Sequence, residues 1–167
     1  MRKQCKRKQY VNPLASFAAI ERQKPIPRDT YLDVAILSYI NLDRLSRGLV
    51  PSVGLAKPEV DPSAIQWTTA VLLGVSLAKQ AMHAGNKAGG LELLRIAESA
   101  YHAFADAVDR SNKSTSGYIV LNSDQLRKSR LFCNHFDSVL QRCSIGNLVD
   151  ATADAEHALI KGGFKLA

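Results

Sequence analysis

Residues 61–85 read DPSAIQWTTAVLLGVSLAKQAMHAG, and this stretch decides the fold. Asp61 and Pro62 form a typical helix start, and Gly85 a typical helix end. The run from residue 64 to residue 78 is uncharged, but it is shorter than the ~20 residues that span a bilayer and it includes four polar side chains. We therefore predict a buried central helix that covers the single Trp67 at least partly. Its apolar side chains are Ile65, Val71, Leu72, Val75 and Met82.

Other segments show the same helical character. The 167 residues include 21 alanines and 20 leucines, and few segments alternate apolar and polar residues as strands do. With 46% apolar and 22% charged residues, the chain can bury one core. We predict an all-α, single-domain bundle of about five helices over residues 29–167, preceded by a basic N-terminal arm of residues 1–28.

The first bundle helix is predicted from Thr30 to Gly48. Thr30 and Asp33 have the spacing of a capping box, and glycine is a common helix stop. Residues 49–60 contain two prolines and a glycine without helical periodicity, so they form a loop whose role stays open. The side chains expected to face the core are Leu32, Ile36, Tyr39 and Ile40, with Leu37 beside them.

A third helix is predicted over residues 91–110, separated from the central helix by Gly89 and Gly90. Its core stripe comprises Leu94, Ala97, Tyr101, Phe104, Ala105 and Val108. After a polar loop, residues 118–121 (YIVL) have the composition of a strand. Because we expect no second strand to pair with them, we predict an extended lead-in that buries Ile119 and Leu121.

The last two helices have clear start signals. Asn122 or Ser123 begins a helix that ends at Cys143, and Ser144 begins the final helix, which stops at Gly162. The predicted core side chains of the two helices are Phe132, Phe136, Val139, Leu140, Leu148, Thr152, Ala155 and Leu159.

Positive charge is concentrated at the N-terminus. Residues 1–28 carry eight basic side chains and one acidic side chain, net +7, whereas residues 29–167 carry 14 of each sign. Such a block is typical of a solvated tail that contacts phosphate or an acidic surface, although a tail that serves only solubility is the alternative. The candidate contacts to nucleic acid or nucleoprotein are Arg2, Lys3, Lys6, Arg7, Lys8 and Tyr10.

The arm also contains a candidate docking helix. Pro13 fits its first turn, and Leu14, Phe17 and Ile20 share a face that we expect to hold the arm against the bundle. Residues 24–27 (KPIP) then break the helix and read as a linker. The apolar run before them is too interrupted for a secretory leader, so we expect a cytoplasmic chain that does not enter a membrane.

A second basic group, Arg127, Lys128 and Arg130, lies on the predicted helix that begins at residue 122. It extends the candidate binding surface, with a solvated helix face as the alternative. The following helix is poor in arginine and lysine, which argues against reading of a DNA groove by a helix-turn-helix.

Cysteine and histidine form no catalytic or metal-binding pattern. Cys133 and Cys143 lie ten residues apart on one predicted helix, about 15 Å, which is too far for a disulfide, and Cys5 leaves the count odd. Cys133 and His135 lack the second pair that a zinc site needs. The four histidines, spread over four predicted helices, are His83, His102, His135 and His157. We predict no catalytic residues, no metal and no cofactor.

Three segments carry a resemblance to a known group of proteins. They are residues 6–10 (KRKQY), 39–42 (YINL) and 118–121 (YIVL). In this order the chain resembles short helical accessory proteins of proteobacterial phages and mobile elements. The resemblance implies an accessory role, which includes interference with host defence, and it implies no catalytic activity.

These observations favour a non-enzymatic interaction protein. The leading hypothesis is a phage or mobile-element protein that binds a host nucleoprotein complex, such as a CRISPR defence complex, and inhibits or remodels it. The alternative is a nucleic-acid-binding accessory or regulatory protein that acts through its basic arm without a protein partner. An enzyme is the third option, and no residue pattern supports it.

Overall fold

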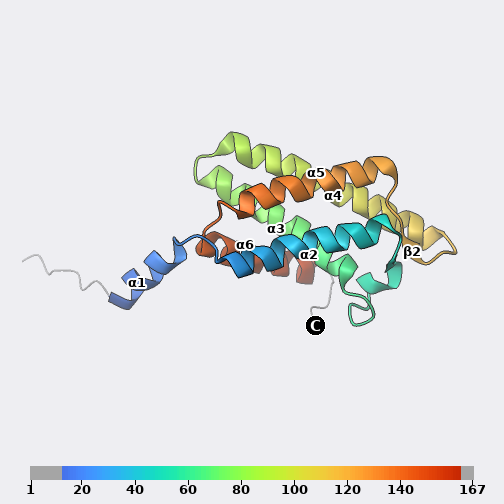
Figure 1. Cartoon of the computed structure of the whole chain (residues 1–167), viewed down its shortest axis with the longest axis horizontal. Coiled ribbons are helices and arrows are strands. Elements are labelled where there is room, and N and C mark those ends of the chain that lie inside the picture. The colour runs from blue at the N-terminus through green and yellow to red at the C-terminus, as the bar shows by residue number, and fades with distance from the viewer. Residues whose placement is uncertain (1–12, 163–167) are drawn as a thin grey trace, which may run out of the picture.

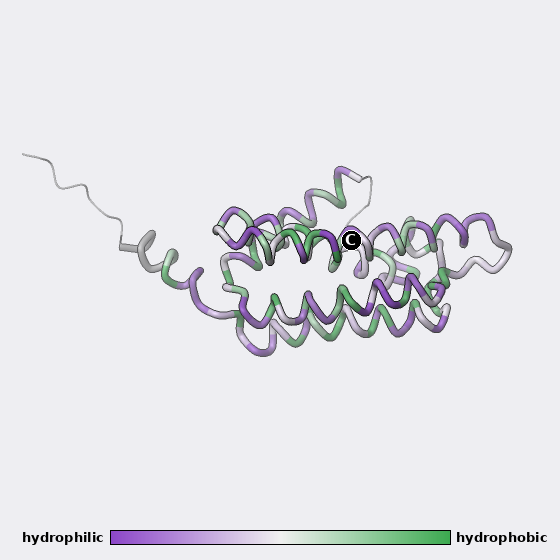
Figure 2. Tube along the Cα trace, turned by 90° about the horizontal axis from the view of Figure 1, so that it is seen from above, coloured by the Kyte–Doolittle hydropathy of each residue, from purple (hydrophilic) through white to green (hydrophobic). Residues whose placement is uncertain are grey.

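The computed structural model describes residues 13–162, with side chains described from residue 18 onward. Five helices form a bundle and α1 extends from one end of it (Figure 1). The helices are α1 (Pro13–Arg22), α2 (Arg28–Ser46), α3 (Ser63–His83), α4 (Lys87–Lys113), α5 (Ser123–Leu140) and α6 (Ile145–Lys161). The all-α prediction is confirmed, and Figure 2 shows hydrophobic and hydrophilic residues alternating along the helices.

Helix α3 is the centre of the bundle, as its sequence predicts, and it packs against α2, α4 and α6. Trp67 is fully buried, with its ring edge-on to Phe132 at a centroid distance of 5.8 Å. Phe132 stacks in turn on Phe136 at 5.2 Å. A Cβ atom on Gly74 would lie 2.7 Å from the Phe132 ring, so glycine is what lets α5 approach α3 this closely. These aromatic rings join α3 to α5 in the core.

The turn between α3 and α4 corrects one predicted boundary. Gly89 and Gly90 lie inside α4, which begins at Lys87 after Asn86, whose side chain accepts a hydrogen bond from the Gly89 amide. A Cβ atom on Gly90 would meet Met82 Cγ at 2.4 Å, so this glycine serves close packing between helices. The chain reverses instead at Gly85, whose φ of 96° suits glycine.

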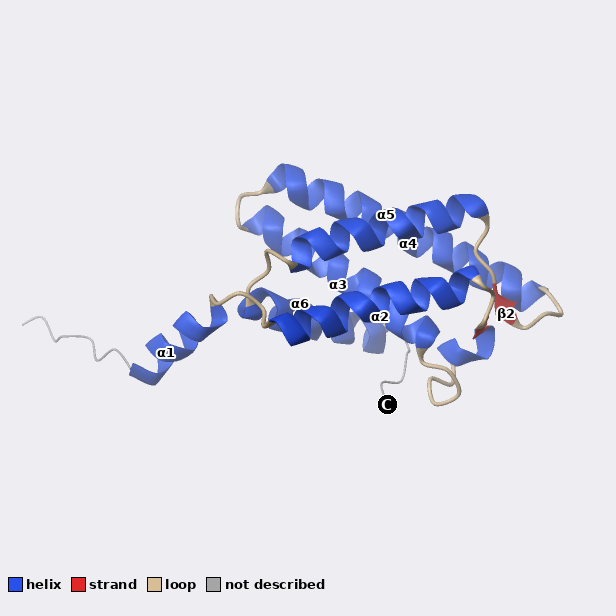
Figure 3. Cartoon of the chain, in the orientation of Figure 1, coloured by secondary structure: helices blue, strands red, loops and turns tan. Residues whose placement is uncertain are grey.

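The extended segment near residue 118 does have a partner, contrary to prediction. Strand β1 (Val50–Pro51) pairs antiparallel with β2 (Tyr118–Ile119), at the end of the bundle opposite α1 (Figure 3). A 3-10 turn, η1 (Ser52–Leu55), continues from β1. Val50, Ile119 and Leu121 are buried, so the loop of residues 49–60 closes one end of the core. The sequence indicated strand character at residues 118–121, but its partner β1 is only two residues long and includes Pro51, so the sequence did not indicate the pairing.

Helix α2 is rotated relative to its prediction, and it starts at Arg28 after Pro27 rather than at a Thr30 capping box. The buried positions are Ala35, Ser38, Asn41, Leu42 and Leu45. The predicted face is outside: Ile36 and Ile40 are each 48% exposed, and Leu37 and Tyr39 are exposed as well. Small side chains explain the rotation, because Ser38 allows α2 to approach α5 closely enough for Cys133 Sγ to lie 3.9 Å from the Ser38 carbonyl oxygen.

The remaining predicted core positions hold with small changes. Asn122 forms a capping box with Gln125 at the start of α5, and the Ser144 side chain caps α6. Ala97, Phe104, Phe136, Leu148 and Leu159 are buried as expected. Tyr101 is 41% exposed, because α4 instead buries the alanines at positions 100, 103 and 107.

Truncation of the aromatic core tests this packing. Phe136→Ala should lower the free energy of unfolding by about 3–5 kcal/mol, because it leaves a cavity beside Phe132 and Gly74. Leu131→Ala on the same helix should change it by less than about 0.5 kcal/mol, since Leu131 is exposed. Urea unfolding followed by circular dichroism measures both, and equal losses would contradict the assigned faces of α5.

Candidate interaction surface

The N-terminal arm is attached to the bundle at one defined place, the junction of α5 and α6. Arg22, the last residue of α1, donates to both carboxylate oxygens of Asp150 on α6 at 2.6 Å. The backbone of residues 24–26 pairs with the α5–α6 turn, where the Ile145 amide donates to the Lys24 carbonyl at 2.9 Å and the Ile26 amide donates to Cys143 at 3.3 Å. Residues 24–26 of the predicted linker are therefore hydrogen-bonded to the bundle, and we call this segment the strap.

Gly146 makes this attachment possible. A Cβ atom at this position would lie 2.9 Å from the carbonyl oxygen of Arg22, so any larger residue pushes the strap away from α6. The predicted docking face contributes less, because Ile20 is 60% exposed. The side chains of Leu14 and Phe17 lie outside the described residues. The end of α1 is thus held by polar and backbone contacts, and α1 itself extends away from the bundle (Figure 1).

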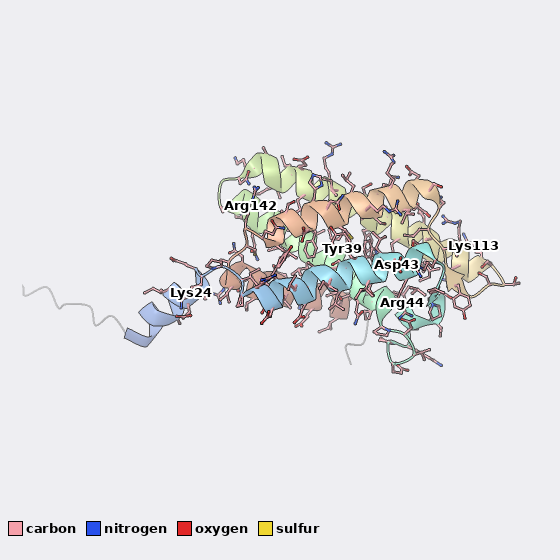
Figure 4. All side chains as sticks on the ribbon, in the orientation of Figure 1. Lys24, Tyr39, Asp43, Arg44, Lys113 and Arg142 are labelled. Carbon is pink, nitrogen blue, oxygen red and sulfur yellow. The ribbon has the colours of Figure 1, made fainter. Side chains whose placement is uncertain are left out.

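The candidate binding residues of the arm, at positions 2–10, lie outside the described residues. What the structure adds is their point of departure, since Pro13 begins a helix that leads outward from the α5–α6 end of the bundle (Figure 1). Lys24 lies near that exit (Figure 4) and is paired with Glu21 at 2.6 Å.

The three candidate cations of α5 do not form one patch. Asp124 pairs with Arg127 at 2.9 Å and with Lys128 at 2.8 Å. Hydrogen bonds from Lys128 and then Arg127 lower the pKa of the Asp124 carboxyl below its usual value. Arg130 lies apart from them, in the groove between α2 and α5, and no carboxylate of the described residues pairs with it. Arg130 is therefore the available cation of the three.

Arg130 lines a groove between α2 and α5. The groove encloses about 320 Å³ and is lined by Tyr39, Leu42, Asp43, Ser46, Leu126, Arg130 and Asn134. The Tyr39 hydroxyl donates to Asn134 Oδ1 at 3.2 Å, and Figure 4 shows Tyr39 and Asp43 along α2. About two turns earlier on α2, Tyr31 donates to Asp137 at 2.5 Å, a bond that raises the pKa of Tyr31. The groove combines hydrogen-bonding groups, one unpaired cation and an aromatic ring, as protein interfaces do.

A second cavity, of about 400 Å³, lies between the α3–α4 turn and the α5–α6 turn. His135 Nε2 is 3.6 Å from Glu92 Oε1 at its rim, and Gln80 Oε1 is buried without a hydrogen-bond partner among the described residues. Cys143 also lines the cavity, but burial raises the pKa of its thiol. A nucleophilic cysteine needs a lowered pKa, so this cavity lacks the electrostatics of thiolate catalysis.

The described cysteines are free and buried. Cys143 follows the end of α5 at Leu140, so, contrary to the prediction, Cys133 and Cys143 do not share one helix. Burial raises the pKa of Cys133 to about 12. Within residues 13–162, no three histidine, cysteine or acidic side chains cluster closely enough to hold a metal ion. Among the same residues, no helix has the length and apolar character to cross a membrane.

No known protein family, curated protein or solved structure matches this chain. The surface residues that the sequence did not indicate are those that depend on distant contacts. The bond between Arg22 and Asp150 joins residues 128 positions apart, and the groove joins Tyr39 to Asn134 across 95. The sequence indicated polar residues on α5, but it did not indicate which residues of α2 lie opposite them, so it did not predict the groove.

Weakening the strap should release the arm without unfolding the bundle. Gly146→Val should make trypsin cleave the native protein several-fold faster after Arg22, because the valine side chain displaces the backbone of Arg22. Ala153→Val places the same side chain at an exposed position of α6 and should leave the cleavage rate unchanged. Mass spectrometry follows the cleavage over time. Equal cleavage rates in the parent protein and both variants would show that the strap does not hold the arm.

Thiol chemistry provides a pH test of the core. The folded pKa of Cys133, about 12, lies above its ordinary value of 9.0, so the thiol ionises more readily in the unfolded chain. Stability should therefore decline as the pH rises from about 9 toward 12. In a Cys5→Ser variant at pH 8.5, iodoacetamide should alkylate the native protein far more slowly than the urea-unfolded protein. Comparable rates would contradict the burial of Cys133 and Cys143.

Proposed function

We propose that this chain is a non-enzymatic interaction protein of a phage or mobile element that acts in the cytoplasm by binding a host nucleoprotein complex. The observation that carries the proposal is the separation of charge: residues 1–28 hold a net charge of +7 and residues 29–167 hold none. A basic extension on a neutral domain suits a partner that offers phosphate to the extension and protein to the domain.

The attachment of the strap to the bundle supports separate binding roles for the arm and the bundle. Because residues 24–26 are bonded to the α5–α6 turn, the arm leaves the bundle from a fixed place and its cations can search for phosphate around that place. The five cations at positions 2, 3, 6, 7 and 8 accelerate the encounter, since electrostatic attraction raises association rates more than it lowers dissociation rates.

The bundle supplies the protein contact in this proposal. Arg130 lines the α2–α5 groove together with Tyr39 and Asn134, and it forms no ion pair among the described residues. Arginine and tyrosine are the residue types that most often contribute strongly to protein interfaces. By occupying a surface of the host complex, the bundle inhibits or remodels it, and a defence complex is the partner that the mobile-element resemblance suggests.

The second candidate is a nucleic-acid-binding protein that acts through the arm alone. It is favoured by five cations within seven positions followed by Tyr10, whose ring can stack on a base. The paired state of Arg127 and Lys128 weighs against it, because a dedicated nucleic-acid binder usually carries a basic footprint on its folded domain.

Removal of residues 1–10 separates the two candidates. If a nucleoprotein is the partner, the truncated chain still binds it, with slower association, and the full chain binds bare DNA or RNA only weakly. Tight binding to bare nucleic acid would support the second candidate instead. Its signatures are a slope of log affinity against log salt near −0.9 per duplex phosphate, for up to about five contacts, and complete loss on truncation.

A matched pair of substitutions tests the share of the bundle in the same assay. Arg130→Glu should weaken binding of the nucleoprotein by roughly tenfold or more, because it removes a cation from the groove. Arg127→Glu changes charge equally on the same helix, but at an exposed side chain already paired with Asp124, and should have a smaller effect. Affinity capture from a bacterial host, with and without nuclease, supplies the partner, and equal effects would remove the groove from the interface.

A further inference from the structure

A groove lies at the corner where α4 ends and β2 begins, at the end of the bundle opposite α1 (Figure 3). It has a volume of about 440 Å³, and Figure 4 shows Lys113 at this end. Its wall carries two cations, three hydroxyl groups and an aromatic ring, and none of its described lining residues is acidic. The polar lining residues are Arg110, Ser111, Lys113, Ser114, Ser116 and Tyr118.

The guanidinium of Arg110 is held in place by uncharged groups. Its Nη2 atom donates to Gln125 Oε1 at 2.6 Å and to the Val120 carbonyl oxygen at 3.1 Å. Arginine has five N–H donors, so these two bonds fix its position and leave donors for a ligand. Because neither acceptor is a carboxylate, the positive charge of Arg110 is not neutralised.

The negative groups near the groove leave its wall positively charged. Asp106 and Asp109 precede the two cations on α4, but they do not line the groove, and neither they nor Lys113 form an ion pair within residues 18–162. The C-terminal end of α4 contributes about half a negative charge, which is less than the two positive charges of Arg110 and Lys113. The wall of the groove therefore suits an anion.

One hydroxyl group in the wall has no hydrogen-bond partner. Ser111 is 4% exposed, and its Oγ atom is buried without a partner among the described residues. The hydroxyl oxygens of Ser114 and Ser116, in contrast, lie 2.8 Å apart and share a hydrogen bond. A buried hydroxyl without a partner destabilises the fold, so an acceptor that reaches Ser111 gains a bond that the free protein does not make.

We propose that this groove binds a phosphate of single-stranded nucleic acid. Arg110 and Lys113 donate charge-assisted hydrogen bonds to the phosphate oxygens, and Ser111 donates its unused hydroxyl. Tyr118 is 50% exposed beside them, so its ring stacks on a base next to the bound phosphate. A single strand fits better than a duplex, because only unpaired bases leave the stack to contact an aromatic side chain.

The inference rests on the proposed nucleoprotein partner only for the source of the strand. Because the groove and α1 lie at opposite ends of the bundle (Figure 1), the arm and the groove contact the nucleic acid of that partner at two separate places. Two cations hold a bare strand only weakly, so the groove is a subsite and not the extended basic surface of a dedicated nucleic-acid binder.

The backbone amide signals of the groove test the proposal in the full chain. In heteronuclear NMR spectra at low salt, a uridine hexanucleotide at millimolar concentration should shift the signals of residues 111–118 in a saturable way. Uridine monophosphate should shift the same signals with lower affinity, because it offers a single phosphate and no neighbouring nucleotide. These signals report on the groove separately from the arm, which lies at the opposite end of the bundle.

Two matched pairs of variants assign the contacts. Ser111→Ala and Ser129→Ala each remove a buried hydroxyl without a partner, but only Ser111 lines the groove. Ser111→Ala should raise the dissociation constant of the hexanucleotide about 3-fold or more without lowering the free energy of unfolding, and Ser129→Ala should leave the dissociation constant unchanged. Lys113→Gln should raise it roughly 3- to 10-fold, whereas Lys87→Gln, at the other end of α4, should not.

Three outcomes would overturn the proposal. They are the absence of these shifts with the hexanucleotide, a dissociation constant that Ser111→Ala or Lys113→Gln leaves unchanged, and tighter binding of the monophosphate than of the hexanucleotide. None of them alters the result expected for the truncated arm, because that assay measures binding of the host complex.

Discussion

The contact between α2 and α5 determines which side chains of α2 lie at the surface. Ser38 on α2 faces Cys133 on α5, and both side chains are small enough for the two helices to pack closely. This contact fixes the rotation of α2 about its axis, and that rotation places Ile36 and Ile40 outside. It also creates the adjoining groove, because the Tyr39 hydroxyl then reaches Asn134.

The close packing of α2 and α5 has a cost in buried polar groups. Asn41 Nδ2 and Ser129 Oγ are buried without hydrogen-bond partners among the described residues, and each such group costs about 1–3 kcal/mol. The opposite rotation would bury Ile36 and Ile40 and return Asn41 to water, but it would expose Leu42 and Leu45, which are buried in the structure. The basic arm is attached to the bundle by the bond between Arg22 and Asp150 on α6.

Local signals in the sequence predicted the parts of the fold that local chemistry determines. Asn122 and Ser144 begin helices because their side chains cap the amides that follow, and Phe136 faces the core because its neighbours repeat every three or four residues. Apart from the start of α2 at Arg28, the errors involve contacts between segments. The pairing of Val50 with Ile119 links two loops, and the position of Gly90 within α4 depends on Met82 in the preceding helix.

The outward face of α2 is the most informative of these errors. Hydrophobic periodicity favoured the larger side chains, whereas the packed structure selected Ala35 and Ser38, because the partner helix also offers small residues. The same limit applies to the candidate site: the cations of α5 were found from composition, but Asp124 separates two of them from Arg130. The sequence alone does not show that Arg130 lies in a groove beside α2, because that groove forms only when α2 packs against α5.

Unfolding of a Ser38→Leu variant tests the orientation of α2 most directly. If Ser38 packs against α5, the larger side chain overfills that contact and lowers the free energy of unfolding by about 1–3 kcal/mol. If Ile36 and Ile40 face the core instead, residue 38 lies at the surface, and the variant is as stable as the parent. A destabilised Ser38→Leu protein is the result expected here, and an unchanged or more stable one would contradict the outward placement of Ile36 and Ile40.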